Sequence, residues 1–262
     1  MARDILVSII GDDVFARDWM SLLLVRDWRT RVISEITSRD DFESFRHDGF
    51  QKVDFYLIDV DSLSNTPQFL ENVFTLASST PQTKLIFVSQ QTDLSILKYI
   101  TQDRFAGYLL KDEILSSLAW AITYASEGSL VLTPSTLKFF QSQNITLPAN
   151  KMILRSRSIP GLTERQTDIA RLAIIFSIGR RDLADELKIS DQWSYGMVSE
   201  LYYKLGLTTL FDGTFDAYRY MENDDVIKDH INEILADLQP SKKARDVETL
   251  AFHLLTMPSI EF

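Results

Sequence analysis

The chain has 262 residues, 45% of them apolar, and a formal net charge of −10. This length favours two modest domains over one large domain, and the apolar fraction is sufficient for a core in each. The lack of cysteine excludes disulfides, thiolate metal sites and cysteine nucleophiles. The acidic balance excludes non-specific polyanion binding by the whole chain, so any nucleic-acid contact requires a local patch.

The N-terminal stretch MARDILVSIIGDD has only a short apolar run. It resembles neither a secretory signal nor a membrane span, so we expect a cytoplasmic protein with no membrane partner. The three histidines, His47, His230 and His253, are far apart in the sequence, which makes a histidine-rich metal site implausible.

Residues 1–127 alternate between two hydrophobic periods. Short apolar runs rich in β-branched and aromatic residues predict strands at 4–10, 31–36, 53–60, 84–89 and 106–110. The segments between and after them have helical spacing, at 14–28, 40–49, 66–79, 93–103 and 112–128. This alternation predicts an α/β domain: a doubly wound, five-stranded parallel sheet with helices on both faces.

The pattern breaks after this region. Residues 128–159 are polar, apart from a short helix expected at 133–140, and we interpret them as a linker. Residues 160–208 predict an all-α domain, with helix N-caps at Thr163 and Ser190 and a C-terminal glycine at Gly206.

Residues 209–262 form a tail with 11 acidic and 5 basic residues. Amphipathic stretches at 217–238 and 243–257 predict that the tail folds into packed helices. A structural extension, a dimer contact and an autoinhibitory shield over the basic residues remain open as its role.

Polar side chains stand where the predicted strands of the first domain end. Ligands of doubly wound sheets bind at this edge, near the point where the strand order reverses. Carboxylates there suit Mg²⁺, and an Asp beside the metal can accept a phosphoryl group. A lysine would neutralise phosphoryl charge, and a hydroxyl would sense the new phosphate and move. The residues are Gly11, Asp12 and Asp13 after the first strand, Asp59 and Asp61, Ser89, and Lys111.

The sequences FYLIDVD, LIFVS and AGYLLKD resemble the receiver domain of bacterial response regulators. The resemblance implies that Asp59 is the phospho-acceptor, Ser89 the phosphate-sensing hydroxyl, Lys111 the phosphate-pairing lysine and Tyr108 the aromatic switch. The alternative is a receiver fold that no longer signals, in which these groups are only solvated polar side chains.

The acid pair of the family falls on Gly11 and Asp12, so one acid is missing. The usual Met-Pro turn after the acceptor is also absent. The resemblance therefore implies a weak Mg²⁺ site, with Asp12 and Asp59 as ligands and Asp13 in part replacing the lost acid.

Residues 162–207 resemble the helix-turn-helix domain of the LuxR/NarL class of response regulators. The matching residues are Leu-Thr-Glu-Arg from Leu162, Leu183-Ala184, Ile189-Ser190 and Lys204-Leu205-Gly206. With the receiver, this makes the chain similar to an atypical regulator of that class with a C-terminal extension. Such a domain places its recognition helix in the major groove of DNA. The candidate DNA-binding residues are Arg180, Arg181, Lys188, Gln192, Trp193, Tyr195 and Lys204.

The charge of this second domain leaves two interpretations open. Phosphate contacts need cations, yet residues 160–208 carry 6 basic and 7 acidic residues. Either dimerisation doubles the few phosphate contacts, or the helix has lost DNA binding and its Trp193, Tyr195 and Met197 contact a protein. Simple packing of these three side chains against the tail is the third alternative.

We therefore predict a response-regulator-like transcription factor in which phosphorylation of Asp59 by a histidine kinase controls homodimerisation and DNA binding. We do not expect an enzyme. The alternative is a degenerate regulator that acts as a protein-interaction adaptor, without DNA binding or phosphorylation. A metabolic enzyme on the same sheet is disfavoured, because the sequence has no Gly-rich phosphate loop and no histidine beside the carboxylates.

Overall fold

The computed structural model describes residues 4–37, 52–61, 63, 68, 70–71, 82–100, 103–159, 161–207, 232 and 243–262. The chain divides into unit 1, Met1–Ser156 with Pro258–Phe262, and unit 2, Arg157–Met257. No helix in the described ranges is long and apolar enough to cross a bilayer. The helices expected at 40–49 and 217–238, and most of the one at 66–79, lie outside the described residues.

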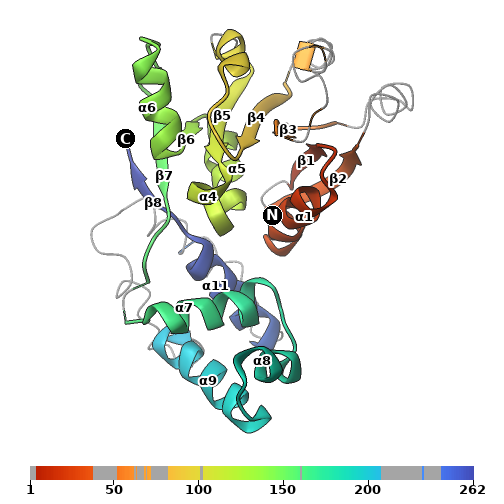
Figure 1. Cartoon of the computed structure of the whole chain (residues 1–262), viewed down its shortest axis with the longest axis vertical. Helices are drawn as coiled ribbons and strands as arrows, with labels where there is room; N and C mark the ends of the chain where they lie inside the picture. Colours follow the sequence, from red (N-terminus) through yellow and green to blue (C-terminus); the bar gives the residue numbers. More distant parts are fainter. Residues whose placement is uncertain are drawn as a thin grey trace. The chain divides into compact units, whose positions relative to one another are not determined.

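Unit 1 is built on a single sheet with the strand order β2-β1-β3-β4-β5-β6-β7-β8 (Figure 1). Pairing is parallel from β2 to β7, and β8 is antiparallel to β7. The strands are β1 (Ile5–Ile10), β2 (Thr30–Ile36), β3 (Phe55–Asp59), β4 (Lys84–Ser89), β5 (Phe105–Leu110), β6 (Leu130–Leu132), β7 (Lys151–Arg155) and β8 (Ser259–Glu261).

The parallel α/β sheet is confirmed, but within the described residues it has eight strands and not the five expected. Residues 128–159, interpreted as a linker, instead contribute β6, helix α6 (Pro134–Ser142) and β7 to unit 1. Gly107 explains how a strand fits beside β5. A Cβ atom at this position would lie 2.5 Å from Val131 Cγ2 and 2.7 Å from Val131 O, so only glycine allows β6 to approach.

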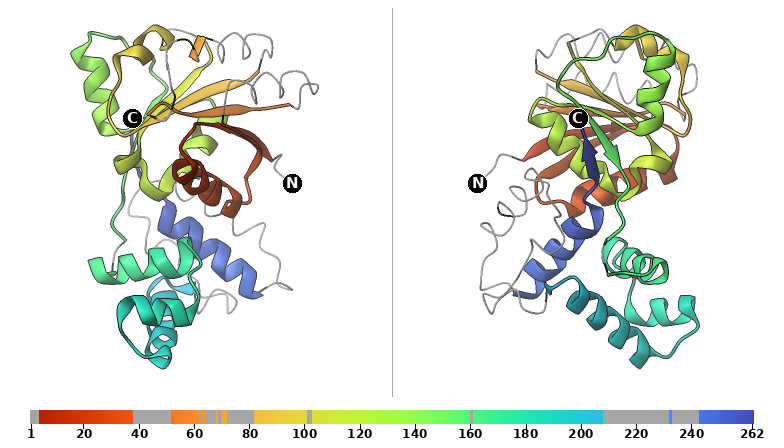
Figure 2. Two further views of the ribbon diagram at one scale, coloured as in Figure 1. Left: turned by 45° about the vertical axis from the view of Figure 1, so that its right-hand side comes forward. Right: turned by 90° about the vertical axis from the view of Figure 1, so that its left-hand side faces the viewer.

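Helices cover both faces of the sheet (Figure 2). On one face lie α1 (Val14–Arg26) and α5 (Leu118–Ser126), which contact each other. The residues of α5 from Leu118 to Ala125 are all buried, as expected of a helix that is apolar all round. The described part of unit 1 also contains three short elements: η1 (Leu94–Tyr99), α4 (Lys111–Ile114) and η2 (Leu115–Ser117).

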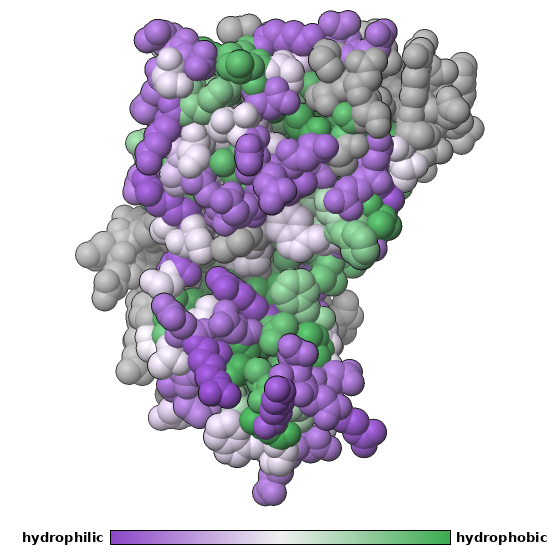
Figure 3. Space-filling model, viewed as in Figure 1, coloured by the Kyte–Doolittle hydropathy of each residue, from purple (hydrophilic) through white to green (hydrophobic). Residues whose placement is uncertain are grey.

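On the opposite face, α6 packs over an aromatic core that includes Phe87, Phe105, Tyr108 and Phe140. Side chains of successive strand residues point to opposite faces, so the sheet serves as the floor of both layers. On the surface shown in Figure 3, hydrophilic residues predominate over unit 1, with apolar residues between them.

Unit 2 is helical in its described part. It contains α7 (Glu164–Ala170), the π-helical turn η3 (Arg171–Ile175), α8 (Arg180–Leu187), α9 (Asp191–Lys204) and α11 (Lys243–Thr256). The predicted N-caps are confirmed: Thr163 accepts from Gln166 N, and Ser190 accepts from Trp193 N. Gly206 follows α9 with a φ of 70°, the left-handed conformation that glycine adopts without steric cost. The helix expected from Lys243 is present, whereas β8 after it was not expected.

Candidate functional site

The C-terminal ends of the parallel strands form one edge of the sheet, the carboxyl edge, and this edge brings Asp59 and Lys111 together. Asp59 is the last residue of β3 and is completely buried, and Lys111 directly follows β5. The Lys111 Nζ lies 2.7 Å from Asp59 Oδ1 and 3.0 Å from Asp61 Oδ2. The Asp61 carboxylate also accepts a 2.6 Å hydrogen bond from the backbone N–H of Gln90, at the end of β4. One ammonium thus bridges two carboxylates, and Asp61 ties that pair to the next strand.

Burial and pairing act in opposite directions on the charges of this site. Burial raises the pKa of the Asp59 carboxyl above its ordinary value, and the hydrogen bond from Lys111 opposes that rise. For Lys111, burial alone would lower the pKa, but the hydrogen bonds to Asp59 and Asp61 outweigh burial and the pKa is raised. The ammonium therefore stays charged at neutral pH and is held at the buried carboxylate.

Ser89 and Tyr108 form a second cluster at the same edge. Ser89 is the last residue of β4, and Tyr108 lies on β5. Their side-chain oxygens are 2.9 Å apart, and Ser89 Oγ also donates to Gln91 O at 2.6 Å. The Tyr108 hydroxyl accepts from Asp93 N at 2.8 Å. Burial raises the pKa of Tyr108, so its hydroxyl stays protonated and can take part in this network.

The turn after β1 holds the remaining predicted residues. Asp13 is the N-cap of α1, and its Oδ1 accepts from Phe15 N at 2.8 Å and Ala16 N at 3.4 Å. The buried Arg17 donates to Gly11 O at 2.7 Å, which braces the same turn. Asp12 is exposed. Asp13 is thus engaged in capping, a role that the Asp-Asp sequence before a helix could have suggested.

Whether these residues can hold Mg²⁺ depends on the side-chain oxygens that the site offers as ligands. The described residues contain no group of three Asp, Glu, His or Cys side chains placed to hold a metal. Asp13 is engaged by the helix and Gly11 has no side chain, so the carboxylates considered as ligands are the exposed Asp12 and the Lys111-paired Asp59. Mg²⁺ commonly takes one or two carboxylates and keeps several waters, so the donor chemistry fits a weakly held ion.

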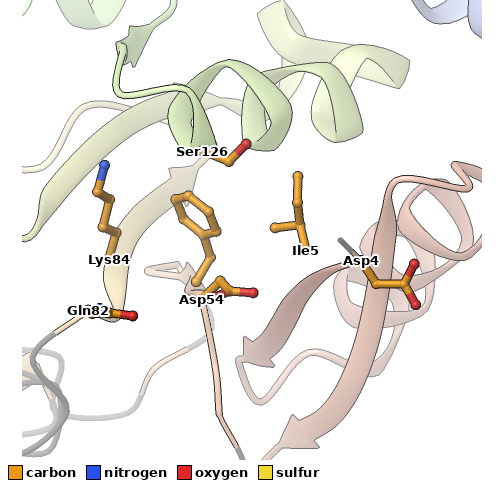
Figure 4. Close-up of a pocket in the computed structure, with 7 residues that line it drawn as sticks. Asp4, Ile5, Asp54, Gln82, Lys84 and Ser126 are labelled. Atoms are coloured by element: carbon orange, nitrogen blue, oxygen red, sulfur yellow. The ribbon is translucent and has the colours of Figure 1, made fainter. Parts of the chain in front are cut away.

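A separate cavity of about 300 Å³ lies at the opposite edge, where β1, β3 and β4 begin (Figure 4). Its charged side chains already have partners in unit 1. Asp54 accepts from Leu6 N at 2.9 Å, Lys84 donates to Ala125 O at 3.4 Å, and Asp4 pairs with Arg31 at 3.2 Å. We therefore place the candidate site at the carboxyl edge.

In unit 2, helix α9 carries three exposed aromatic side chains. Trp193, Tyr195 and Tyr203 are 57%, 60% and 71% exposed. Gln192 is also exposed, whereas Ser194 is buried and its hydroxyl donates to backbone oxygens of Arg180 and Asp191. A cavity of about 510 Å³ opens between α7 and α9; its lining includes Ile169, Trp193, Gly196 and Met197.

The cations predicted to bind DNA differ in how far they are engaged by other side chains of unit 2. Lys204 Nζ lies 2.9 Å from Gln166 Oε1 and 3.5 Å from Glu200 Oε1, so it joins α7 to α9. Arg180 and Arg181 begin α8, and the exposed Lys188 ends it in the left-handed conformation with a φ of 54°. Neither the sequence spacing nor the family resemblance indicated the Gln166–Glu200–Lys204 network.

No family model matches the chain. The transcriptional regulatory protein LnrK of Bacillus subtilis (strain 168) is 23% identical over 219 residues, which cover 82% of this chain and 96% of LnrK. The match is long enough to include parts of both units.

Among solved structures, the chain is similar to the response regulator ChrA of a heme-sensing two-component system. The identity is 21%, the coverage is 78% of this chain and 90% of ChrA, and the TM-score is 0.38. It is also similar to the response regulator RcsB of Salmonella typhimurium, with 14% identity, coverage of 88% and 99%, and a TM-score of 0.44. These similar proteins are thus two response regulators and a transcriptional regulatory protein.

Proposed function

We propose that the chain is a response-regulator-like transcription factor in which Asp59 accepts a phosphoryl group and thereby controls unit 2. The observation that carries this proposal is the 2.7 Å contact between Lys111 Nζ and the buried Asp59 carboxylate at the carboxyl edge of a parallel sheet. Ser89 and Tyr108 at the same edge support it, and so does the name of the similar Bacillus protein.

In the proposed reaction, an Asp59 oxygen attacks the phosphorus of a phosphohistidine on a kinase or of a small phosphodonor. The new O–P bond forms as the bond from phosphorus to the leaving group breaks, and the leaving group keeps that electron pair. Lys111 pairs with the phosphoryl oxygens, whose charge spreads during transfer. Mg²⁺, when held by Asp12 and Asp59, would add positive charge at those oxygens.

The phosphate would then change the hydrogen bonds of the second cluster. A phosphoryl oxygen is a strong acceptor and competes for the Ser89 hydroxyl, which now donates to Gln91 O. Tyr108 shares its hydrogen-bond network with Ser89, so its environment changes as well. We propose that this rearrangement alters homodimerisation and the DNA affinity of unit 2.

The proposed DNA contacts come from the margins of the helix-turn-helix. Arg180 and Arg181 at the start of α8 and Lys188 at its end would contact phosphates, while Gln192 and Tyr195 on α9 would contact base edges. Two copies of the chain would double the phosphate contacts, which is why we include a homodimer in the proposal.

A second function, as a protein-interaction adaptor, is favoured by one observation. Helix α9 exposes Trp193, Tyr195 and Tyr203, while Lys204 is held by Gln166 and Glu200. Exposed aromatic side chains are enriched at protein interfaces, and Trp193 also lines the cavity between α7 and α9.

Two measurements test the proposal. Intact-mass analysis after incubation with Mg²⁺ and a small phosphodonor should show one added phosphoryl group, which is absent in Asp59→Ala. No gain, or a gain that persists in Asp59→Ala, rules out phosphorylation at this residue. A fluorescence titration with promoter fragments at low and higher salt should show salt-sensitive binding. Absence of binding at low salt leaves the adaptor function.

A further inference from the structure

Helix α6 is attached to β5 at the residues that flank Lys111. The ladder between β5 and β6 pairs Gly107 with Val131 and Tyr108 with Leu132. Beyond this ladder, threonine side chains make the hydrogen bonds to β5. The Leu110 N–H donates to Thr133 Oγ1 at 3.1 Å, and Thr136 Oγ1 donates to Tyr108 O at 2.9 Å. Both threonines are completely buried, so these bonds are shielded from water.

A second attachment lies on the other side of Lys111. Glu113, on α4, accepts from Ser135 Oγ at 2.6 Å and from Ser135 N at 3.0 Å. Burial raises the pKa of Glu113, but these two bonds, a hydrogen bond from Thr133 and the charge of Lys138 together lower it, so the carboxylate is ionised at neutral pH. The sequence Thr133-Pro-Ser-Thr136 therefore holds the backbone before Lys111 and the side chain two residues after it.

The third attachment is aromatic. The hydroxyl of Tyr108 is bonded at the candidate site to Ser89 and to Asp93 N. Its ring packs against Phe140 of α6, with the centroids 5.9 Å apart. Since closely packed interiors resist continuous deformation, a Tyr108 ring that leaves this position requires Phe140 to move as well.

We propose that Thr133, Thr136 and Phe140 are positioning residues, and that they couple α6 to the Asp59–Lys111 site through the backbone around Leu110 and the ring of Tyr108. The inference rests on the proposed function for the nature of the signal that α6 transmits. It assigns to α6, β6 and β7 a regulatory role in the response to phosphorylation.

The position of these elements in the sheet identifies the part of the chain that the coupling would reach. Helix α6 leads to β7, which pairs with β6 on one side and with β8 on the other. Unit 1 ends at Ser156, directly after β7, and resumes at Pro258, directly before β8. Both covalent connections to unit 2 therefore leave from this pair of strands. A shift of α6 that changes β7 therefore acts on the strand pair from which both connections to unit 2 start.

Coupling between distant groups needs a measured interaction, so the test is a double-mutant cycle read by hydrogen–deuterium exchange on the full chain. Tyr108→Phe removes the hydroxyl bonds but keeps the ring, and it perturbs the site without phosphate. We expect it to change the exchange rate of 151–155 about threefold or more, because local opening responds to lost contacts. Combined with Phe140→Leu, the same substitution should have little further effect.

Phe139→Leu is the matched control, since Phe139 is the neighbouring α6 residue and packs on Phe140. In that background Tyr108→Phe should keep its full effect. Thr133→Val should raise the exchange of the Leu110 amide, and Thr133→Ser should restore it. If Phe140→Leu does not fold by circular dichroism, Phe140→Met takes its place in the cycle.

The outcomes separate this inference from the proposed function. The coupling is overturned if Tyr108→Phe does not change the exchange rate of 151–155. It is also overturned if Phe139→Leu abolishes the effect of Tyr108→Phe as fully as Phe140→Leu does. A mass gain at Asp59 without any change at 151–155 also overturns it, while leaving phosphorylation intact. Coupling in the cycle together with no mass gain supports the inference and removes phosphorylation from the proposed function.

Discussion

The carboxyl edge of unit 1 and the exposed aromatic side chains of α9 in unit 2 are two candidate sites of opposite construction. At the first, a completely buried carboxylate is paired with a lysine, and the nearby hydroxyls have defined partners. At the second, aromatic side chains are exposed and one of the cations is engaged within the unit. Burying a charge is costly without compensation, so a buried pair signals a specific chemistry, whereas an exposed aromatic face suits several partners.

The largest expected effect comes from removing the ammonium at the buried site. Lys111→Met leaves Asp59 and Asp61 without their shared cation. We expect phosphorylation to be lost and the free energy of unfolding at pH 7 to fall by about 3 kcal/mol, since an unpaired buried charge is strongly destabilising. Chemical denaturation and intact-mass analysis measure the two effects.

The pH dependence of this variant has a definite sign. Without Lys111, the folded-state pKa of Asp59 rises further above the unfolded value. A carboxyl with a raised folded pKa loses stability as pH rises through the window between the two values, so the defect should shrink as the pH is lowered into that window. Lys98→Met, which removes an exposed lysine paired with Glu71, is the control and should show neither effect. A pH-independent loss would point to altered packing.

An intermediate effect is expected at the second site, and it separates the two functions of unit 2. Arg180→Ala with Arg181→Ala removes two proposed phosphate contacts. If α8 and α9 bind DNA, we expect about a tenfold loss of affinity at moderate salt and a log–log salt slope reduced by about 2. Titrations at several salt concentrations measure both quantities.

Trp193→Ala is the counterpart of that double variant. It removes the exposed aromatic side chain of α9 without changing charge, so it should leave the salt slope of DNA binding unchanged. Under the adaptor function, the ranking is reversed: Trp193→Ala weakens the partner's binding most, because buried aromatic anchors dominate protein interfaces. An arginine pair whose loss changes no salt slope would contradict the DNA contacts proposed for α8.

The sequence was a good guide to the central strands of the sheet and to its carboxyl edge. Asp59, Ser89 and Lys111 stand at the ends of buried strands, and parallel strands necessarily bring such ends to one edge. The strands β6 and β7 were missed because they are short and lie in a polar segment, where periodicity is weak. Gly107 was the available signal, since glycine inside a strand marks a close approach of another backbone.

Contacts that depend on side-chain geometry could not be predicted from the sequence. The second carboxylate on Lys111, from Asp61, depends on where a turn places that side chain. The link from Lys204 to Gln166 joins residues 38 positions apart on different helices. In unit 2, caps such as Thr163 and Ser190 were predictable because their hydrogen bonds are local.

The smallest expected effect distinguishes two adjacent acids in the turn after β1. Asp13→Ala removes the N-cap of α1, whose carboxylate accepts from Phe15 N and Ala16 N. We expect a loss of about 1 kcal/mol in the free energy of unfolding, with phosphorylation of Asp59 largely retained. Asp12→Ala should instead slow phosphorylation at limiting Mg²⁺ and leave stability largely unchanged, because Asp13 is the N-cap of α1 and Asp12 is the proposed Mg²⁺ ligand. Denaturation curves and phosphorylation rates over a range of Mg²⁺ concentrations compare the pair. If Asp13→Ala raised the Mg²⁺ requirement as much as Asp12→Ala, then both acids would serve the metal, and the cap would not be the main role of Asp13.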